Sequence, residues 1–188
     1  MAIGVLALQG AVAEHVDSLR RLGVEARAVR TPQDLEGVAG TILPGGESVT
    51  LGKLMERIGL DRALVDFARS GKPIFGTCAG MILVARELEG QRQPLLGLMD
   101  MVMRRNAFGR QIESFEQELA IAGLEDGKFR GVFIRAPYVV QAGPQVTVMA
   151  QVNGKGVLAR QDKLLAAAFH PELTDDLRLH EMFLEIAR

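Results

Sequence analysis

The sequence predicts an α/β fold: a three-layer sandwich in a single domain, with a mostly parallel central sheet, helices on both faces and an antiparallel, hairpin-rich C-terminal half. The first half alternates short apolar runs with segments of helical periodicity, which is typical of parallel strands joined by crossover helices. The second half instead places strand-like runs close together. Because 188 residues can bury one sizeable core and no linker or repeat interrupts them, we expect one domain over residues 1–188.

The elements of the first half follow one another as strand and helix. Each predicted strand is a short apolar run, and each predicted helix repeats apolar residues every three or four positions. In order, they are a strand at 3–8, a helix at 12–22, a strand at 24–29, a short helix opened by Thr31 and Pro32, a strand at 41–44, a helix from near Val49, a helix at 61–71, a strand at 73–76 and a helix at 81–88.

The elements of the second half are mainly strands. They are predicted at 99–106, 113–121, 129–137, 146–154, 155–163 and 164–172, and a helix at 175–188 ends the chain. Their close spacing favours antiparallel hairpins attached to the same sheet.

The composition excludes several classes of function. Lys and Arg number 22 and Asp and Glu 23, so the net charge of −1 gives no basic surface for nucleic acid or an anionic membrane. A single cysteine suits a reducing compartment. No apolar run approaches the ~20 residues of a membrane-spanning helix, and the N-terminus lacks the basic region of a signal peptide. We expect a cytoplasmic protein.

The cysteine, Cys78, stands between Gly76 and Gly80 where the strand at 73–76 ends. Glycines at this spacing relieve crowding at a sharp strand-to-helix turn, from which a nucleophile projects at the carboxyl edge of the sheet. The N-terminal N–H groups of the next helix would help to hold a thiolate, and the N–H of Ala79 could stabilise an oxyanion. A free cysteine is otherwise often a small buried hydrophobe, so a neighbouring base must distinguish the two interpretations.

His170 is the candidate base. It ends a buried-looking strand and precedes Pro171, which favours an extended backbone. Residues two apart in an extended segment point the same way, so Glu172 can accept the N–H of the His170 ring and leave the other nitrogen for Cys78. The alternative is a structural histidine at a strand end with a solvated glutamate.

The other two histidines, His15 and His180, lie in the first and last predicted helices among polar neighbours. We expect each of them to be exposed or to cap a helix. No histidine pair has metal-ligand spacing with a further cysteine or carboxylate, so no metal site is predicted.

Two further segments suggest substrate contacts. Gly45-Gly46 follows the third strand, where glycine lets a backbone N–H turn inward as a second oxyanion donor. Glu47 and Ser48 would then hold an amine or a carboxylate, although Ser48 can also be an ordinary helix N-cap. Arg105, in a turn between strands, could bind a carboxylate, or it could be a solvated loop arginine.

These motifs together resemble class I (triad) glutamine amidotransferases, and more narrowly the family of glutaminase subunits of pyridoxal 5'-phosphate synthase. The turn GTCAGM and the late HPE have the order cysteine, histidine, glutamate, which identifies the wider group. The narrower resemblance covers essentially the whole chain, and its motifs are ALQGAVAEH at 7–15, LPGGES at 43–48, RRNAFGRQ at 104–111, FIRAP at 133–137 and FHPEL at 169–173.

The resemblance implies a role for each matching position. Cys78 would be the nucleophile, His170 the base and Glu172 its orienting partner, while Gly46 and Ala79 would supply the oxyanion hole. The remaining matches are glutamine-binding or pocket residues: Gly46, Glu47, Ser48, Arg105, Ile134, Arg135 and Gln9.

The resemblance also implies an activity and a partner. The domain would hydrolyse L-glutamine through a γ-glutamyl thioester without a cofactor, and deliver ammonia to a separate synthase barrel subunit in a large hetero-oligomer that makes pyridoxal 5'-phosphate. Three alternatives stay open: a glutaminase subunit of another pathway, a cysteine hydrolase or peptidase that acts without a partner, and a non-catalytic binding or redox-sensing module whose Cys78 is merely oxidised.

Overall fold

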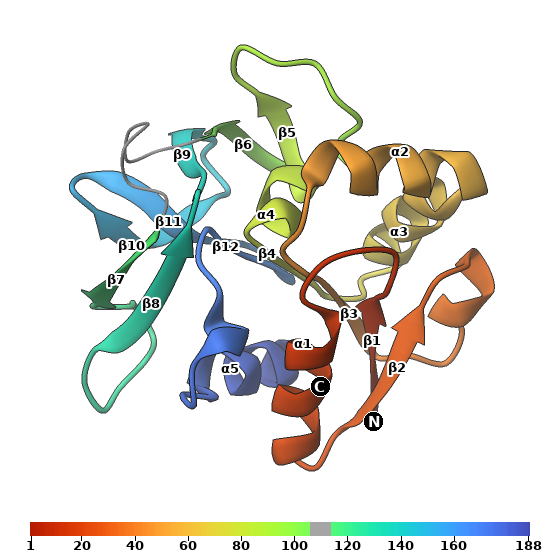
Figure 1. The fold of residues 1–188 in the computed structure, drawn as a ribbon, viewed down its shortest axis with the longest axis horizontal. Coiled ribbons are helices and arrows are strands. Elements are labelled where there is room, and N and C mark those ends of the chain that lie inside the picture. Colours follow the sequence, from red (N-terminus) through yellow and green to blue (C-terminus); the bar gives the residue numbers. More distant parts are fainter. Residues whose placement is uncertain (106–113) are drawn as a thin grey trace.

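One ten-stranded sheet runs through the described residues of the computed structural model, which are 1–105 and 114–188 (Figure 1). Its strand order is β2 (Glu25–Val29), β1 (Ala2–Leu6), β3 (Gly40–Leu43), β4 (Ile74–Thr77), β12 (Leu164–Ala167), β11 (Lys155–Gln161), β9 (Tyr138–Ala142), β6 (Met99–Arg104) and β5 (Ala85–Leu88), and β10 (Thr147–Val152) pairs with β11. A separate hairpin joins β7 (Ser114–Leu119) to β8 (Phe129–Ile134).

Helices cover both faces of the sheet. Figure 1 shows α1 (Val12–Arg21) and α5 (Arg178–Ile186) on one side, and α2 (Ser48–Ile58), α3 (Leu60–Arg69) and α4 (Ala79–Val84) on the other. Two short 3-10 helices, η1 (Pro32–Leu35) and η2 (Pro171–Leu173), complete these elements. The predicted fold class is confirmed.

The parallel part of the sheet positions the site. Strands β2, β1, β3, β4 and β12 pair in parallel, so their carboxyl ends meet at one edge. Beyond β12 the pairing is antiparallel through β11, β9 and β6, as predicted for the second half. The strand β12 comes late in the sequence but lies beside β4, with Ala167 opposite Thr77. This pairing brings the segment after β12 next to the turn after β4.

Three predictions of secondary structure need correction. The helix expected at 81–88 ends at Val84, because residues 85–88 pair in parallel with β6 instead. Buried Ala85 and Leu88 flank the exposed Arg86 and Glu87 there, and sheet pairing overrides the helical pattern. The strand β9 was not predicted, and the last predicted strand ends at Ala167, before His170.

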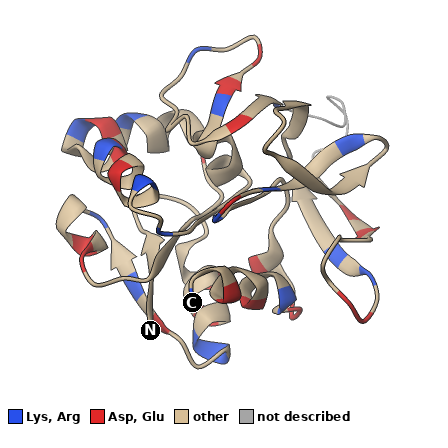
Figure 2. Cartoon of the chain, turned by 180° about the vertical axis from the view of Figure 1, so that it is seen from behind, with Lys and Arg blue, Asp and Glu red and all other residues tan. Residues whose placement is uncertain are grey.

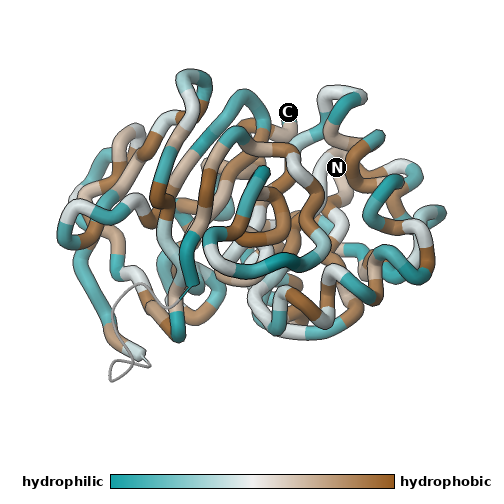
Figure 3. The backbone as a smooth tube through the Cα atoms, turned by 90° about the horizontal axis from the view of Figure 1, so that it is seen from above, coloured by the Kyte–Doolittle hydropathy of each residue, from teal (hydrophilic) through white to brown (hydrophobic). Residues whose placement is uncertain are grey.

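Aromatic residues build much of the core. Phe75, Phe129, Phe133, Phe169 and Phe183 are fully buried, and such side chains stabilise a fold by about 1.5–3 kcal/mol each. In Figure 3, many of the apolar (brown) segments of the backbone tube lie in the middle of the molecule. Charged residues of both signs are mixed over the outer helices and loops in Figure 2. Among residues 1–105 and 114–188, none of the helices has the length and apolar character needed to span a bilayer.

Candidate active site

Cys78 lies at a strained turn between β4 and α4. Its φ of 50° and ψ of −103° are unfavourable for a residue with a side chain. A methyl group on Gly80 would lie 1.9 Å from the carbonyl oxygen of Leu43, and one on Gly76 would lie 2.5 Å from that of Gly80. A side chain at either position would clash with backbone atoms, so the close approach of the chain here requires glycine at both. A 2.7 Å hydrogen bond from the Cys78 N–H to the Ala167 carbonyl ties this turn to β12.

His170 reaches the same edge from the end of β12. Its backbone N–H donates to the Val132 carbonyl at 2.8 Å, and the preceding Phe169 packs against Phe133, with ring centroids 5.4 Å apart. The imidazole lies beside Cys78, since a methyl group on Gly45 would be 2.4 Å from His170 Cε1 and 3.3 Å from Cys78 Cβ. The structure thus brings the predicted nucleophile and base together.

Glu172 contacts His170 as expected, but the backbone between them does not have the extended conformation that was predicted. The two residues do not lie on an extended segment, because Pro171 begins the 3-10 helix η2, where its fixed φ suits the first helical position. The turn still brings the Glu172 carboxylate behind the ring, with Oε1 2.7 Å from His170 Nδ1. Glu172 is buried and does not line the pocket, whereas His170 does.

The protonation of His170 reflects these neighbours. Burial disfavours the imidazolium, but the contacts with Cys78 and Glu172 outweigh it and raise the pKa of His170 to about 10. The ring is therefore protonated at neutral pH, and the imidazolium is held between Cys78 and the Glu172 carboxylate.

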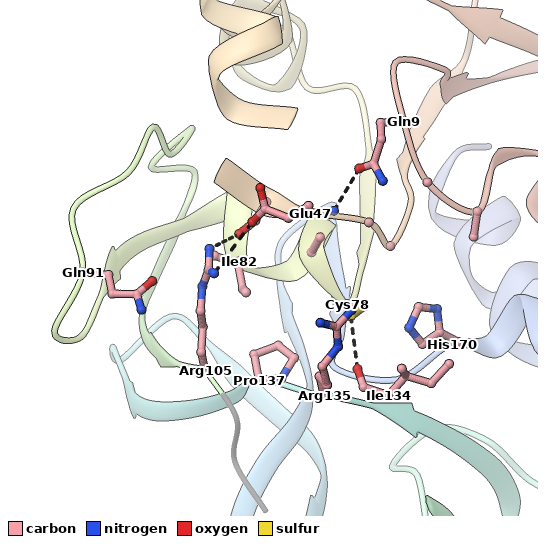
Figure 4. A pocket seen from close by; sticks show the side chains of 16 residues that line it. Gln9, Glu47, Cys78, Ile82, Gln91, Arg105, Ile134, Arg135, Pro137 and His170 are labelled. Atoms are coloured by element: carbon pink, nitrogen blue, oxygen red, sulfur yellow. Dashed lines mark hydrogen bonds and ion pairs between the residues drawn. The ribbon is translucent and has the colours of Figure 1, made fainter. Parts of the chain in front are cut away.

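A pocket of about 510 Å³ opens in front of Cys78 and His170 (Figure 4). It is lined by every predicted site residue except Glu172. They are Gln9, Gly46, Glu47, Ser48, Cys78, Ala79, Arg105, Ile134, Arg135 and His170. Gly45, which was predicted to form the turn with Gly46, also lines the pocket, and the structure adds lining residues that had not been singled out: Gly10, Ala11, Ile82, Gln91 and Pro137. Of these, Gly10, Ala11 and Pro137 lie within the quoted motifs, while Gln91 lies in a loop that carried no signal.

The loop after β1 holds the Gly45-Gly46 segment from one side. The Ala11 N–H donates to the Gly45 carbonyl at 3.0 Å, and Gln9 Oε1 accepts from the Glu47 N–H at 2.9 Å (Figure 4). A methyl group on Gly10, whose φ is +106°, would lie 1.8 Å from the Gly45 oxygen. Gln9 thus acts on this segment through its side chain.

Glu47, rather than Ser48, is the N-cap of α2. Its carboxylate accepts from the N–H groups of Val49 and Thr50 at 3.1 and 2.8 Å. Burial opposes ionisation, but the hydrogen bond from the Thr50 hydroxyl, these two backbone hydrogen bonds and the Arg105 charge lower the pKa of Glu47. Arg105 Nη1 lies 3.8 Å from Glu47 Oε1, and its Nη2 also donates to Ser48 Oγ and to Gln93 Oε1. A cation and a hydroxyl therefore meet at this end of the pocket.

Ile134 and Arg135 form the opposite wall, at the end of β8. The Ile134 carbonyl lies 3.9 Å from Cys78 Sγ, and Arg135 has a φ of +44°, an uncommon value for a non-glycine residue (Figure 4). In the motif RRNAFGRQ, residues 106–111 lie outside the described residues.

The expectation for His15 and His180 was wrong. Both are fully buried, with His15 Nδ1 3.0 Å from His180 Nε2. His15 Nε2 lies 3.0 Å from Thr77 Oγ1 and 3.4 Å from Glu172 Oε2. Burial, then the neighbouring His180 and His170, hold the pKa of His15 well below its usual value, and burial lowers that of His180 to about 4. Each histidine lies one helical turn from buried apolar residues of its own helix. This spacing would have predicted burial, but the polar residues next to each histidine in the sequence favoured an exposed position.

Comparison with known proteins gives consistent matches. A model of the SNO glutamine amidotransferase family matches residues 5–188. The curated pyridoxal 5'-phosphate synthase subunit PdxT of Desulforamulus reducens is 55% identical over 188 residues, which is the whole of both chains. PdxT of Geobacillus kaustophilus is also 55% identical, over 100% of this chain and 95% of its own.

Solved structures agree with these matches. A crystal structure of a glutamine amidotransferase has a TM-score of 0.94 and 50% identity, covering 98% of each chain. A structure of PurLQS from Thermotoga maritima, at 16% identity and a TM-score of 0.74 over 100% of this chain and 98% of that one, shares the fold alone.

Proposed function

The chain belongs to the SNO glutamine amidotransferase family, and we propose on this premise that it is the glutaminase subunit of a pyridoxal 5'-phosphate synthase. It hydrolyses L-glutamine to glutamate and ammonia and serves vitamin B6 synthesis. The observation that carries the proposal is the meeting of Cys78, His170 and Glu172 at one edge of the sheet, behind a pocket open to a small molecule.

The reaction begins from the state in which the Cys78 proton is held on His170 and the sulfur is a thiolate. The thiolate attacks the side-chain amide carbon of glutamine and forms a tetrahedral intermediate with a negatively charged oxygen. Backbone N–H groups of Gly46 and Ala79 stabilise that oxygen, and Ala79 is well placed because it is the first residue of α4. Glu172 holds the His170 ring so that one nitrogen faces the reaction.

Collapse of the intermediate releases ammonia. His170 donates its proton to the departing nitrogen, and the carbon remains bound to sulfur as a γ-glutamyl thioester. Water, activated by the same ring, then attacks the thioester, so glutamate leaves and the thiol is restored. Each turnover consumes one water molecule for one glutamine.

The far end of the pocket suits the amino-acid end of the substrate. Arg105 offers a cation for the α-carboxylate, while Glu47 and the Ser48 hydroxyl offer acceptors for the α-ammonium group. Gln9, Ile134 and Arg135 complete the walls. This assignment orients the side-chain amide toward Cys78.

The ammonia is used by a second polypeptide. PdxT relatives carry the name of a synthase subunit, and we infer that this chain docks on a barrel-shaped synthase partner in a hetero-oligomer, without nucleic acid or membrane. We expect the complex to act in the cytoplasm.

The test is glutamate release from L-glutamine by the purified chain, alone and with the synthase subunit, with Cys78→Ala as the control. We expect activity that rises with the partner and is absent from the variant. Activity lost in the variant but indifferent to the partner would reassign the pathway. No activity in either mixture, from folded protein and a competent synthase, would refute the glutaminase function.

A further inference from the structure

A line of buried polar side chains continues behind the triad, away from the pocket. Glu172 of η2 is followed by His15 of α1 and then by His180 of α5, and all three are buried. The helices α1 and α5 lie on the same face of the sheet in Figure 1. Successive contacts are 3.4 Å from Glu172 Oε2 to His15 Nε2 and 3.0 Å from His15 Nδ1 to His180 Nε2. The proposed reaction uses neither histidine directly.

The Glu172 carboxylate is only half satisfied by the triad. Oε1 receives the His170 ring N–H, whereas Oε2 is buried and has no hydrogen-bond partner that meets strict geometry among the described residues. The His15 Nε2 atom lies close to this oxygen. Leaving a buried carboxylate oxygen without a donor is costly, so the protonation of His15 decides the environment of Glu172.

Two neutral forms of His15 are possible in principle. With the proton on Nδ1, the Nε2 lone pair could accept from the Thr77 hydroxyl but would also face the carboxylate, and His180 would have to accept at Nε2. His180 would then carry its own proton on Nδ1, a buried atom without a partner among the described residues. That form combines a repulsive contact with a stranded donor.

The other form resolves both problems. With the proton on Nε2, His15 shares its N–H between Thr77 Oγ1 at 3.0 Å and Glu172 Oε2 at 3.4 Å. His180 donates from Nε2 to His15 Nδ1, and only a lone pair remains at His180 Nδ1. The N–H groups then all point from His180 through His15 toward Glu172, as a chain of oriented dipoles.

We propose that His15, fixed by His180, is a positioning residue that holds the Glu172 carboxylate in place for His170. The proposal rests on the proposed glutaminase function. Without the His15 N–H, the carboxylate can rotate and no longer fixes the orientation in which the other nitrogen of the His170 ring faces Cys78. Because burial keeps His15 neutral, it does not compete with the His170 imidazolium for the negative charge of Glu172.

Two substitutions of His15 separate positioning from packing. In His15→Gln the side-chain amide nitrogen can reach the place of Nε2, whereas in His15→Asn it reaches only the place of Nδ1. We expect His15→Asn to lower kcat for glutamine about 10- to 100-fold with KM within about twofold, and His15→Gln to stay within about threefold of the unchanged chain. Ser18→Ala is the matched control, because the buried Ser18 hydroxyl bonds the Glu14 carbonyl of the same helix at 3.0 Å.

Equal losses in His15→Asn and His15→Gln would overturn the proposal, since they would indicate a packing role. Unchanged kcat in a folded His15→Asn would overturn it as well. The tautomer can also be read in the unchanged chain by long-range ¹H–¹⁵N NMR of the imidazoles, which needs neither a folded variant nor activity. A proton on Nε2 of His15 is expected, and a proton on Nδ1 would refute the inference. If the unchanged protein is inactive both alone and with a competent synthase subunit, the glutaminase function is refuted instead, while the tautomer can still be measured.

Discussion

Lowering the pH from 6.5 to 5.5 is expected to reduce the free energy of unfolding by about 1.6 kcal/mol, because two histidines are buried in neutral form. The pKa values of His15 and His180 lie below the value near 6.5 of an unfolded chain. The unfolded chain therefore binds more protons in this range, and stability falls as the pH falls. The effect begins near pH 6.5, well above the range in which most carboxylates titrate.

The magnitude follows from the three histidines together. Each buried neutral imidazole loses about 1 kcal/mol of stabilisation over this pH unit, as the unfolded chain goes from half to about nine-tenths protonated. His170 acts in the opposite direction, because its pKa is raised to about 10. The stabilisation from His170 is fully present below pH 6.5 and is lost as the pH rises toward 10. Lowering the pH from 6.5 to 5.5 therefore raises the His170 contribution to the free energy of unfolding by about 0.4 kcal/mol.

The assay is urea denaturation at pH 6.5, 6.0 and 5.5, with His180→Gln as the matched variant. Glutamine does not titrate, and its amide can still donate to His15 Nδ1. The variant should lose only about 0.6 kcal/mol over the interval, because one of the two neutral imidazoles is gone. Stability that is flat between pH 6.5 and 5.5 would show that both histidines ionise freely in the folded state, and an equal fall in both proteins would show that His180 does.

Three further substitutions test the site and the fold. His170→Gln should lower kcat about 10²- to 10⁴-fold in steady-state glutamate release, and a smaller loss would mean that another group serves as the base. Arg105→Gln should raise KM for glutamine about tenfold or more by removing a charged carboxylate contact, whereas an unchanged KM would place the carboxylate elsewhere. Gly80→Ala should lower the free energy of unfolding in urea by about 3 kcal/mol or more, since its methyl group would lie 1.9 Å from the Leu43 oxygen. The control Gly90→Ala, which meets nothing within 4 Å at a φ of +74°, should lose only about 1 kcal/mol. Similar losses in the two variants would contradict the close contact at Gly80.

The first half of the fold could be predicted because its signals are local. Apolar runs and helical spacing mark each strand and helix there, and the glycines around Cys78 mark the turn that backbone contact requires. The segment at 85–88 could not be assigned in this way. Its strand exists because β6, from residues 99–104, pairs with it, and that partner is distant in sequence.

The site was predictable from its motifs, and its buried support was not. Glycines, a proline and a glutamate two residues from His170 are visible in the sequence. The burial of His15 depends on α5 closing over α1 from the other end of the chain, through a contact between residues 165 apart. His15 does lie one helical turn before the buried Leu19. The sequence around a histidine with charged neighbours nevertheless looks the same whether the ring faces solvent or the core.

The late position of β12 has a consequence for synthesis. This strand lies between β4 and β11 in the middle of the sheet, yet it emerges after residue 163. Until then, β4 lacks its neighbour on one side, and the turn at Cys78 lacks the Ala167 carbonyl that holds it. A nascent chain therefore carries a thiol with no base beside it, and hydrolytic capacity arises only when the last strand closes the gap. Pairing of β12 with β4 and assembly of the catalytic machinery are therefore the same event.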